Sequence, residues 1–212
     1  VTLPSFVEDT PFTTANAPTV ETLFASAFQD TIDRNNLNQN TFIGIAIIQD
    51  FAANGENGAE DREAAAQIGY EKGQWEVYDI RNAQWVALPN DLSEDNAYLV
   101  PKTTQIRYKP NANYNGELPP IEAYLVDNGL GQALGLGQRI NLSQTGVGGV
   151  TRYTATTVML NGSIEAVNDL PPAANDLSAI NLSDNGQDED LAAPPTQSVA
   201  ALFASRFGLQ ET

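Results

Sequence analysis

Short segments rich in β-branched and aromatic residues recur along most of this chain, and pairs of turn-forming residues separate them. Strand-like composition is found in segments 42–48, 75–78, 85–88, 98–100, 106–108, 121–126, 152–160 and 164–167. The turn-forming pairs are Asn54-Gly55, Pro89-Asn90, Pro110-Asn111 and Asn115-Gly116. Branched and aromatic side chains pack well on a pleated surface, whereas Gly, Pro and Asn end strands. Many short strands joined by turns predict a mainly β fold and favour a β-sandwich.

One segment near the start has helical spacing instead. Apolar residues stand at positions 20, 23, 24 and 28, and Asn16 and Pro18 precede them where a helix cap and a first-turn proline belong. We expect a short helix there. A second helical run, 61–67, lies in the connection 51–72, which we expect to be a long polar loop on a rigid sandwich.

The pattern of the first helical segment recurs near the other end of the chain. Val20, Leu23, Phe24, Ala25, Ser26 and Phe28 are repeated as Val199, Leu202, Phe203, Ala204, Ser205 and Phe207, at a constant offset of 179 residues. Such a repeat is typical of tandem arrays. We expect a first module over 1–170 and a linker rich in Pro, Asn and Asp over 171–188. Residues 189–212 are then either the start of a second module or the returning segment of a split domain.

The chain is strongly acidic, because 27 Asp and Glu residues against 10 Lys and Arg residues give a formal net charge of −17. Nucleic acids are bound mainly through clustered basic residues, so we expect no nucleic-acid partner. The longest apolar run, around 42–48, is too short to cross a bilayer, and we expect no membrane insertion. Acidic residues also keep surfaces soluble, but here they cluster with Asn and Gly in loops, a composition that suits bound divalent cations.

Cysteine and histidine are both absent from the sequence. Zinc, copper and iron sites usually need thiolate or imidazole ligands, which leaves oxygen-binding cations such as calcium. Histidine-dependent triads and Cys-His pairs are excluded as well, and we expect the protein not to be an enzyme. Without disulfides, bound calcium can hold acidic loops together and stabilise the fold.

An ordered series of short motifs resembles the cadherin-like modules of giant bacterial adhesins, including the RTX adhesins. Besides the Leu23-Phe24 helix, the motifs are Glu8-Asp9-Thr10-Pro11, Gly44-Ile45-Ala46-Ile47, Gly73-Gln74-Trp75-Glu76-Val77-Tyr78, Ala83-Gln84-Trp85, Arg107-Tyr108-Lys109-Pro110-Asn111, Asn113-Tyr114-Asn115-Gly116 and Val167-Asn168-Asp169-Leu170-Pro171. They cover residues 8–171, and their order is more specific than any single motif. The chain departs from the family pattern at Leu125-Val126-Asp127, where the acid is kept and the usual aromatic residue is lost.

This resemblance implies a cadherin-like or Ig-like β-sandwich that calcium stabilises and that is secreted to the bacterial cell surface. Some modules of the family resemble ligand-binding domains that capture peptides on another cell. The resemblance therefore implies a role in cell adhesion and biofilm formation. The implied partners are a peptide or protein C-terminus on a target cell and the neighbouring modules of the same chain, and we expect a monomer.

Acidic and amide side chains at strand ends and in loops are the candidate calcium ligands, because calcium binds roughly six to eight oxygen atoms. The candidate metal ligands are Asp127, Asn168, Asp169, Asp30, Asp33, Asp50, Glu56 and Asp61. The candidate peptide-binding residues are Asn54, Asn57 and Arg62. We expect a bound calcium ion with vacant positions to accept the terminal carboxylate of the peptide.

Two other functions stay open at this point. The tandem repeat is equally natural in a structural extender that calcium stabilises and that only spaces other domains. A carbohydrate-binding module is the other alternative, because aromatic rings can form a platform for sugars. The candidate rings are those of Trp75, Trp85, Tyr78, Tyr98, Tyr108 and Tyr114. At alternating strand positions, however, aromatic residues more often belong to the core or to cross-strand pairs.

Overall fold

The structure is a computed structural model that describes residues 1–8, 10, 12–29, 40–54, 72–112, 114–129 and 133–167. The chain divides into two units, Val1–Val167 and Asn168–Thr212, and every described residue belongs to the first. The predicted linker 171–188, the predicted segment 189–212 and the helical run 61–67 all lie outside the described residues.

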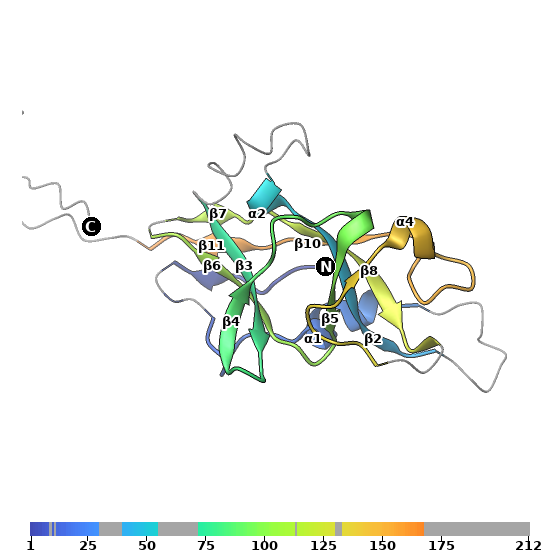
Figure 1. Ribbon diagram of the computed structural model, residues 1–212. Coiled ribbons are helices and arrows are strands. Elements are labelled where there is room, and N and C mark those ends of the chain that lie inside the picture. Colours follow the sequence, from blue (N-terminus) through green and yellow to red (C-terminus); the bar gives the residue numbers. More distant parts are fainter. Residues whose placement is uncertain are drawn as a thin grey trace, which may run out of the picture. The chain divides into compact units, whose positions relative to one another are not determined.

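The described residues form a mainly β unit with several sheets, as the strand pattern predicted (Figure 1). The largest sheet has the strand order β10 (Val158–Leu160), β8 (Ile121–Asp127), β2 (Phe42–Asp50), β5 (Ala97–Pro101), β9 (Arg139–Ile140). A second sheet has the order β4 (Gln84–Ala87), β3 (Gly73–Asp79), β6 (Ile106–Pro110). A third has the order β1 (Phe6–Val7), β11 (Ser163–Glu165), β7 (Gly116–Glu117). This arrangement is consistent with the predicted β-sandwich.

Short helices occur between the strands of the described unit. They are α1 (Val20–Phe24), η1 (Ala25–Ala27), α2 (Phe51–Asn54), η3 (Glu94–Asn96) and α4 (Leu142–Thr145). The predicted first helix is confirmed as α1, which continues into η1. Its cap is Thr19 and not Asn16: the Oγ1 atom of Thr19 accepts a hydrogen bond from Thr22 N at 3.2 Å. Asn16 caps a preceding turn instead, because its Oδ1 atom accepts one from Thr13 N at 2.7 Å.

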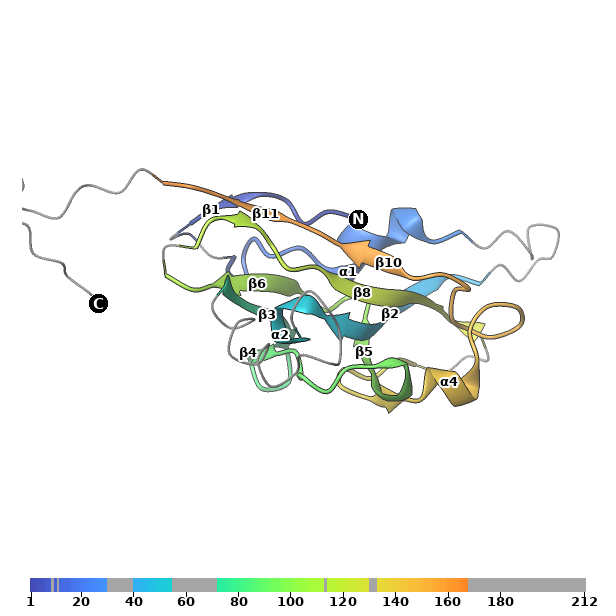
Figure 2. The ribbon, with the colours of Figure 1, turned by 90° about the horizontal axis from the view of Figure 1, so that it is seen from above.

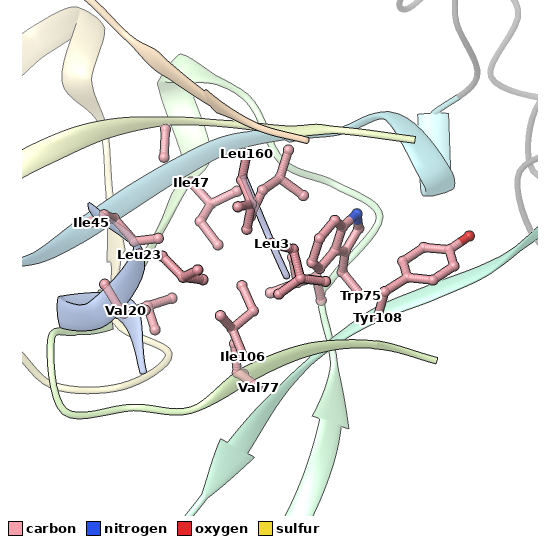
Figure 3. Close-up of a cluster of buried hydrophobic side chains, with 14 of the residues drawn as sticks. Leu3, Val20, Leu23, Ile45, Ile47, Trp75, Val77, Ile106, Tyr108 and Leu160 are labelled. Atoms are coloured by element: carbon pink, nitrogen blue, oxygen red, sulfur yellow. The ribbon is translucent and has the colours of Figure 1, made fainter. Parts of the chain in front are cut away.

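The main core contains side chains from all three sheets, and Figure 3 shows those of β2 and β10 beside those of β3 and β6. Ile45 and Ile47 of β2 belong to it, together with Trp75 and Val77 of β3, and all four are fully shielded from solvent. The indole of Trp75 donates a hydrogen bond from Nε1 to Pro119 O at 2.7 Å. The buried indole N–H therefore has a hydrogen-bond partner, while the rest of the Trp75 side chain packs in the apolar core.

The opposite face of the five-stranded sheet is buried as well. Ala46 and Ile48 of β2 point to this side and form a second cluster with Leu142 of α4 and with Tyr153. Leu142 and Tyr153, which lie between β8 and β10 in the sequence, therefore cover this face of the sheet. A strand that is buried on both faces is apolar at consecutive positions. This double burial explains the uninterrupted apolar run of β2.

Most predicted strands are confirmed within two residues at each end, as β2, β3, β4, β5, β6, β8 and β11. The prediction of one strand over 152–160 is wrong, because only Val158–Leu160 is a strand. The preceding residues turn across the sheet: Tyr153 forms an isolated bridge with Val126, and Thr154 N donates to Leu125 O at 3.0 Å. Burial of Tyr153 in the second cluster fixes this turn.

The first residues of the unit run parallel to its last residues. Strand β1 pairs with β11 in parallel (Figure 2). The pairing extends on both sides of these strands, since Leu3 N donates to Asn161 O at 2.8 Å and Glu8 N donates to Glu165 O at 3.0 Å. Residues that are about 160 positions apart in the sequence are thereby joined along a common edge.

Candidate functional site

Asp127 is the last residue of β8 and is half-buried. Its Oδ1 atom accepts a hydrogen bond from Gly129 N at 2.6 Å, and its Oδ2 atom accepts one from Asn40 Nδ2 at 3.4 Å. The main chain is held by Arg152, whose O accepts from Asp127 N at 2.9 Å and whose Nη2 donates to Asp127 O at 3.1 Å. The carboxylate therefore has a fixed position at the end of the sheet.

Near Asp127 lie Gln29 and Asn40, the two described residues that flank a segment with predicted calcium ligands. Gln29 lines a cavity of about 210 Å³ together with Asp127 and Arg152, and Asn40 contacts the carboxylate directly. Residues 30–39 connect Gln29 to Asn40 and include the predicted ligands Asp30 and Asp33. Both described ends of that segment thus lie beside Asp127.

Asp50, another predicted ligand, lies at the opposite end of the same sheet. Strand β2 pairs Phe42 with Asp127 at one end and Asp50 with Ile121 at the other. At the usual rise per residue, the two carboxylates are about 26 Å apart along β2. Asp50 is 2% exposed, and its Oδ1 atom accepts a hydrogen bond from Ala52 N at 2.8 Å. Asp50 therefore caps α2, and one ion cannot bind both Asp50 and Asp127.

The remaining candidates fall where side chains are not described. Asn54 is the last residue of α2, but the structure does not describe its side chain. The candidates that lie outside the described residues are Asp30, Asp33, Glu56, Asn57, Asp61, Arg62, Asn168 and Asp169.

Glu8 is a carboxylate that the sequence predictions missed as a candidate ligand. It is only 4% exposed. Its Oε1 atom accepts a hydrogen bond from Val167 N at 2.6 Å, and its Oε2 atom accepts one from Asn115 Nδ2 at 3.1 Å. None of the described basic side chains forms an ion pair with it. The sequence did contain a signal, because Glu8-Asp9 has a counterpart in Glu189-Asp190.

Of the six aromatic candidates for a sugar platform, Tyr98 is buried and Tyr114 is half-buried, and the other four form two pairs. Trp75 and Tyr108 are fully buried in the core, where their rings pack edge to face with centroids 5.2 Å apart. Tyr78 and Trp85 are half-exposed on the outer face of the sheet β4-β3-β6, with ring centroids 5.3 Å apart. The guanidinium of Arg107 lies 4.1 Å from the centroid of the Trp85 ring. A cation therefore already occupies one side of the exposed indole.

Within the described ranges, no group of three or more Asp or Glu side chains is arranged to hold a metal ion. In the same ranges, every helix is too short or too polar to cross a membrane. Comparisons of the chain with family models, with curated proteins and with solved structures found no match.

Proposed function

We propose that this chain is a calcium-dependent ligand-binding module of a large secreted bacterial adhesin, which binds a short peptide at the cell surface. The observation that carries the calcium part of the proposal is the burial of Glu8 without a described cationic partner. Two hydrogen bonds compensate only part of the cost of removing a carboxylate from water. A bound cation would compensate the rest.

The place of Glu8 in the chain supports the same ion. Val167, whose N–H donates to the Glu8 carboxylate, directly precedes the predicted ligands Asn168 and Asp169. Carboxylate and amide oxygens are the ligands that calcium prefers. A calcium ion bound by the Glu8 carboxylate would neutralise this buried charge.

Asp127 supports the ligand-binding part of the proposal. A calcium ion bound by its carboxylate would lie next to the cavity that Gln29 and Arg152 line. The chain carries a net charge of −17, so an anionic ligand is repelled unless a cation stands between the two. The terminal carboxylate of a peptide would take a vacant position of the ion.

Two alternatives are less well supported. A purely structural extender module that binds calcium would explain the buried Glu8 carboxylate, but it gives no role to the cavity beside Asp127. A carbohydrate-binding role is weakened because Trp75 and Tyr108 are buried and Trp85 is stacked against Arg107.

The calcium part is tested by thermal unfolding of the full chain with 1 mM calcium and with chelator. An ion at about one hundred times its dissociation constant adds about 2.7 kcal/mol. This stabilisation corresponds to a rise in Tm of about 5 to 10 °C. Glu8→Gln should lose most of the rise, whereas the matched exposed variant Glu21→Gln should keep it. Coinciding melting curves for the wild type would refute the calcium proposal.

The peptide part is tested on an array of short peptides with free or amidated C-termini, read with calcium and with chelator. Binding should require both calcium and a free carboxylate, and Asp127→Asn should weaken it. Binding that persists in chelator would reject the metal-bridged mechanism, and an array without hits would favour the extender.

A further inference from the structure

Strand β4 lies at the edge of its sheet. It pairs with β3 on one side, and no described strand pairs with its other side. In Figures 1 and 2, β4 and β3 form a hairpin with β4 at its outer margin. An edge of this kind presents main-chain donors and acceptors to a strand from another molecule.

The register shows which main-chain groups point outward. Leu88 N donates to Trp75 O at 2.9 Å, so these two residues form a hydrogen-bonded pair of the antiparallel ladder. Such pairs alternate with non-bonded pairs, and Tyr78 lies opposite Trp85 in a non-bonded pair. The N–H and C=O groups of Trp85 and Ala87 therefore point away from β3.

Apart from its length of only four residues, β4 lacks the usual protections of an edge strand. Natural edges are guarded by charged residues, by proline, by bulges or by a covering segment. Gln84, Trp85, Val86 and Ala87 are uncharged, and their register with β3 is continuous. None of the four is fully buried. The edge is therefore open to a partner in the part of the molecule that the structure describes.

The side chains beside this edge form a firm platform. Trp85 packs against Tyr78 on the outer face and is fixed by Arg107, which forms an ion pair with Glu76 at 2.6 Å. That ion pair is mostly buried, with side-chain exposures of 15% and 6%. A strand added beside β4 would thus contact a ring whose position is already set, which reduces the entropy lost on binding.

The charge near β4 differs from that of the whole chain. The hairpin and its sheet carry three basic and two acidic side chains, Arg81, Arg107, Lys109, Glu76 and Asp79, of which Arg107 and Glu76 neutralise each other and Lys109 lies on β6, whereas the chain has a net charge of −17. Arg81 is exposed at the hairpin tip, where it forms no ion pair with a described acidic side chain, although the nearby Asp79 interacts with it electrostatically. An acidic partner is therefore repelled less here than the net charge suggests.

We propose that β4 binds an extended acidic peptide segment as an added antiparallel or parallel strand. The main chain of Trp85 and Ala87 supplies the hydrogen bonds, the Trp85 platform contacts the side chains, and Arg81 attracts the acidic residues. Strand addition of this kind obtains affinity from the main chain and specificity from alternate side chains. It needs neither a metal ion nor a free peptide terminus, so it is independent of the calcium site proposed above.

The test uses the ¹⁵N-labelled full chain and two acetylated, amidated eight-residue peptides, one alternating Val with Glu and one alternating Val with Lys. The Glu peptide should slow amide hydrogen exchange at Trp85 and Ala87 at least about tenfold and should leave Val86, already bonded to β3, unchanged. It should bind more tightly than the Lys peptide, with calcium and with chelator alike. Arg81→Gln should weaken it about threefold.

A proline variant supplies the decisive control. Ala87→Pro removes an outward donor without removing a bond to β3, so the sheet is kept while binding should fall at least about tenfold. The matched variant Ala87→Ser should bind like the wild type. Equal binding by Ala87→Pro, a lack of protection at Trp85 and Ala87, or protection that arises from dimerisation of the chain without peptide would each overturn the proposal. If Ala87→Pro fails to fold, the exchange of the wild-type amides still decides.

Discussion

Gly44, near the start of β2, provides the sharpest test of the described packing, through the substitution Gly44→Ala. The residue lies opposite Pro101 of β5 and Val126 of β8. A Cβ atom at this position would lie 2.3 Å from Val100 O and 2.7 Å from Leu134 Cδ2. The nearer atom belongs to the backbone of the neighbouring strand, so a change of rotamer cannot relieve the contact.

The magnitude follows from the movement that the methyl group requires. An ordinary contact begins at 3.4 Å, so β5 would have to move from β2 by about 1 Å. Overpacking of a core costs about 1 to 3 kcal/mol, and weakening of the adjacent ladder bonds adds about 1 kcal/mol. We expect Gly44→Ala to lower the free energy of unfolding by about 3 to 4 kcal/mol. For a unit of this size, Tm should fall by about 10 °C.

The measurement is urea unfolding, followed by tryptophan fluorescence, of the wild type and two variants. Gly149→Ala is the control, because Gly149 has a φ of +61° and a methyl group added there would meet no atom within 4 Å. It should cost only the strain of a left-handed backbone, about 1 to 2 kcal/mol. If Gly44→Ala were no more destabilising than Gly149→Ala, the close approach of β2 and β5 would be wrong.

Three further substitutions test separate features of the unit. The buried hydroxyl of Tyr108 has no described hydrogen-bond partner, and burial raises the pKa of Tyr108 above its usual 10.0. Tyr108→Phe should therefore raise the free energy of unfolding in urea by about 1 kcal/mol. A loss of stability would reveal a hydrogen bond to that hydroxyl. Ala83 has a φ of +52°, so Ala83→Gly should raise stability by about 1 kcal/mol, and a decrease would argue against the described turn. A hydrogen bond from Arg139 lowers the pKa of Asp91 below 3.8. The stabilisation from this pair is complete above the unfolded pKa and is lost as pH falls through the lower folded pKa. The free energies of unfolding that urea titrations give at about pH 7 and about pH 2 should therefore differ less for Asp91→Asn than for the wild type, by under about 1 kcal/mol because the pair is exposed.

The strands that the sequence predicted are those whose composition alone identifies them. Strand β2 has a long apolar run, and β3 contains Trp75 and Val77 at alternating buried positions. The two-residue strands β1, β7 and β9 were missed, because only partners that are distant in the sequence make them strands. The sequence analysis also missed the residues that cover the second face of the five-stranded sheet. The apolar run of β2 could have indicated them, because a strand with consecutive apolar residues is buried on both faces.

The candidate site was predictable only in part. Asp127 was found because it ends an apolar strand, and Asp50 was chosen for the same reason. Sequence could not show that these two residues lie at opposite ends of β2, because pairing determines that distance. The burial of Glu8 was equally hidden, since it depends on Asn115 and Val167, which are remote along the chain.

The parallel alignment of the first and last residues of the unit determines how it responds to tension. A force applied at Val1 and at Val167 pulls the two aligned segments in opposite directions along their length. The bonds of Leu3 to Asn161 and of Glu8 to Glu165 lie across that pull, so they bear the load together and not one after another. The Glu8 carboxylate adds its bond to Val167 at the loaded end. The unit should therefore yield by sliding of two segments under shear, which needs a larger force than peeling a hairpin apart bond by bond.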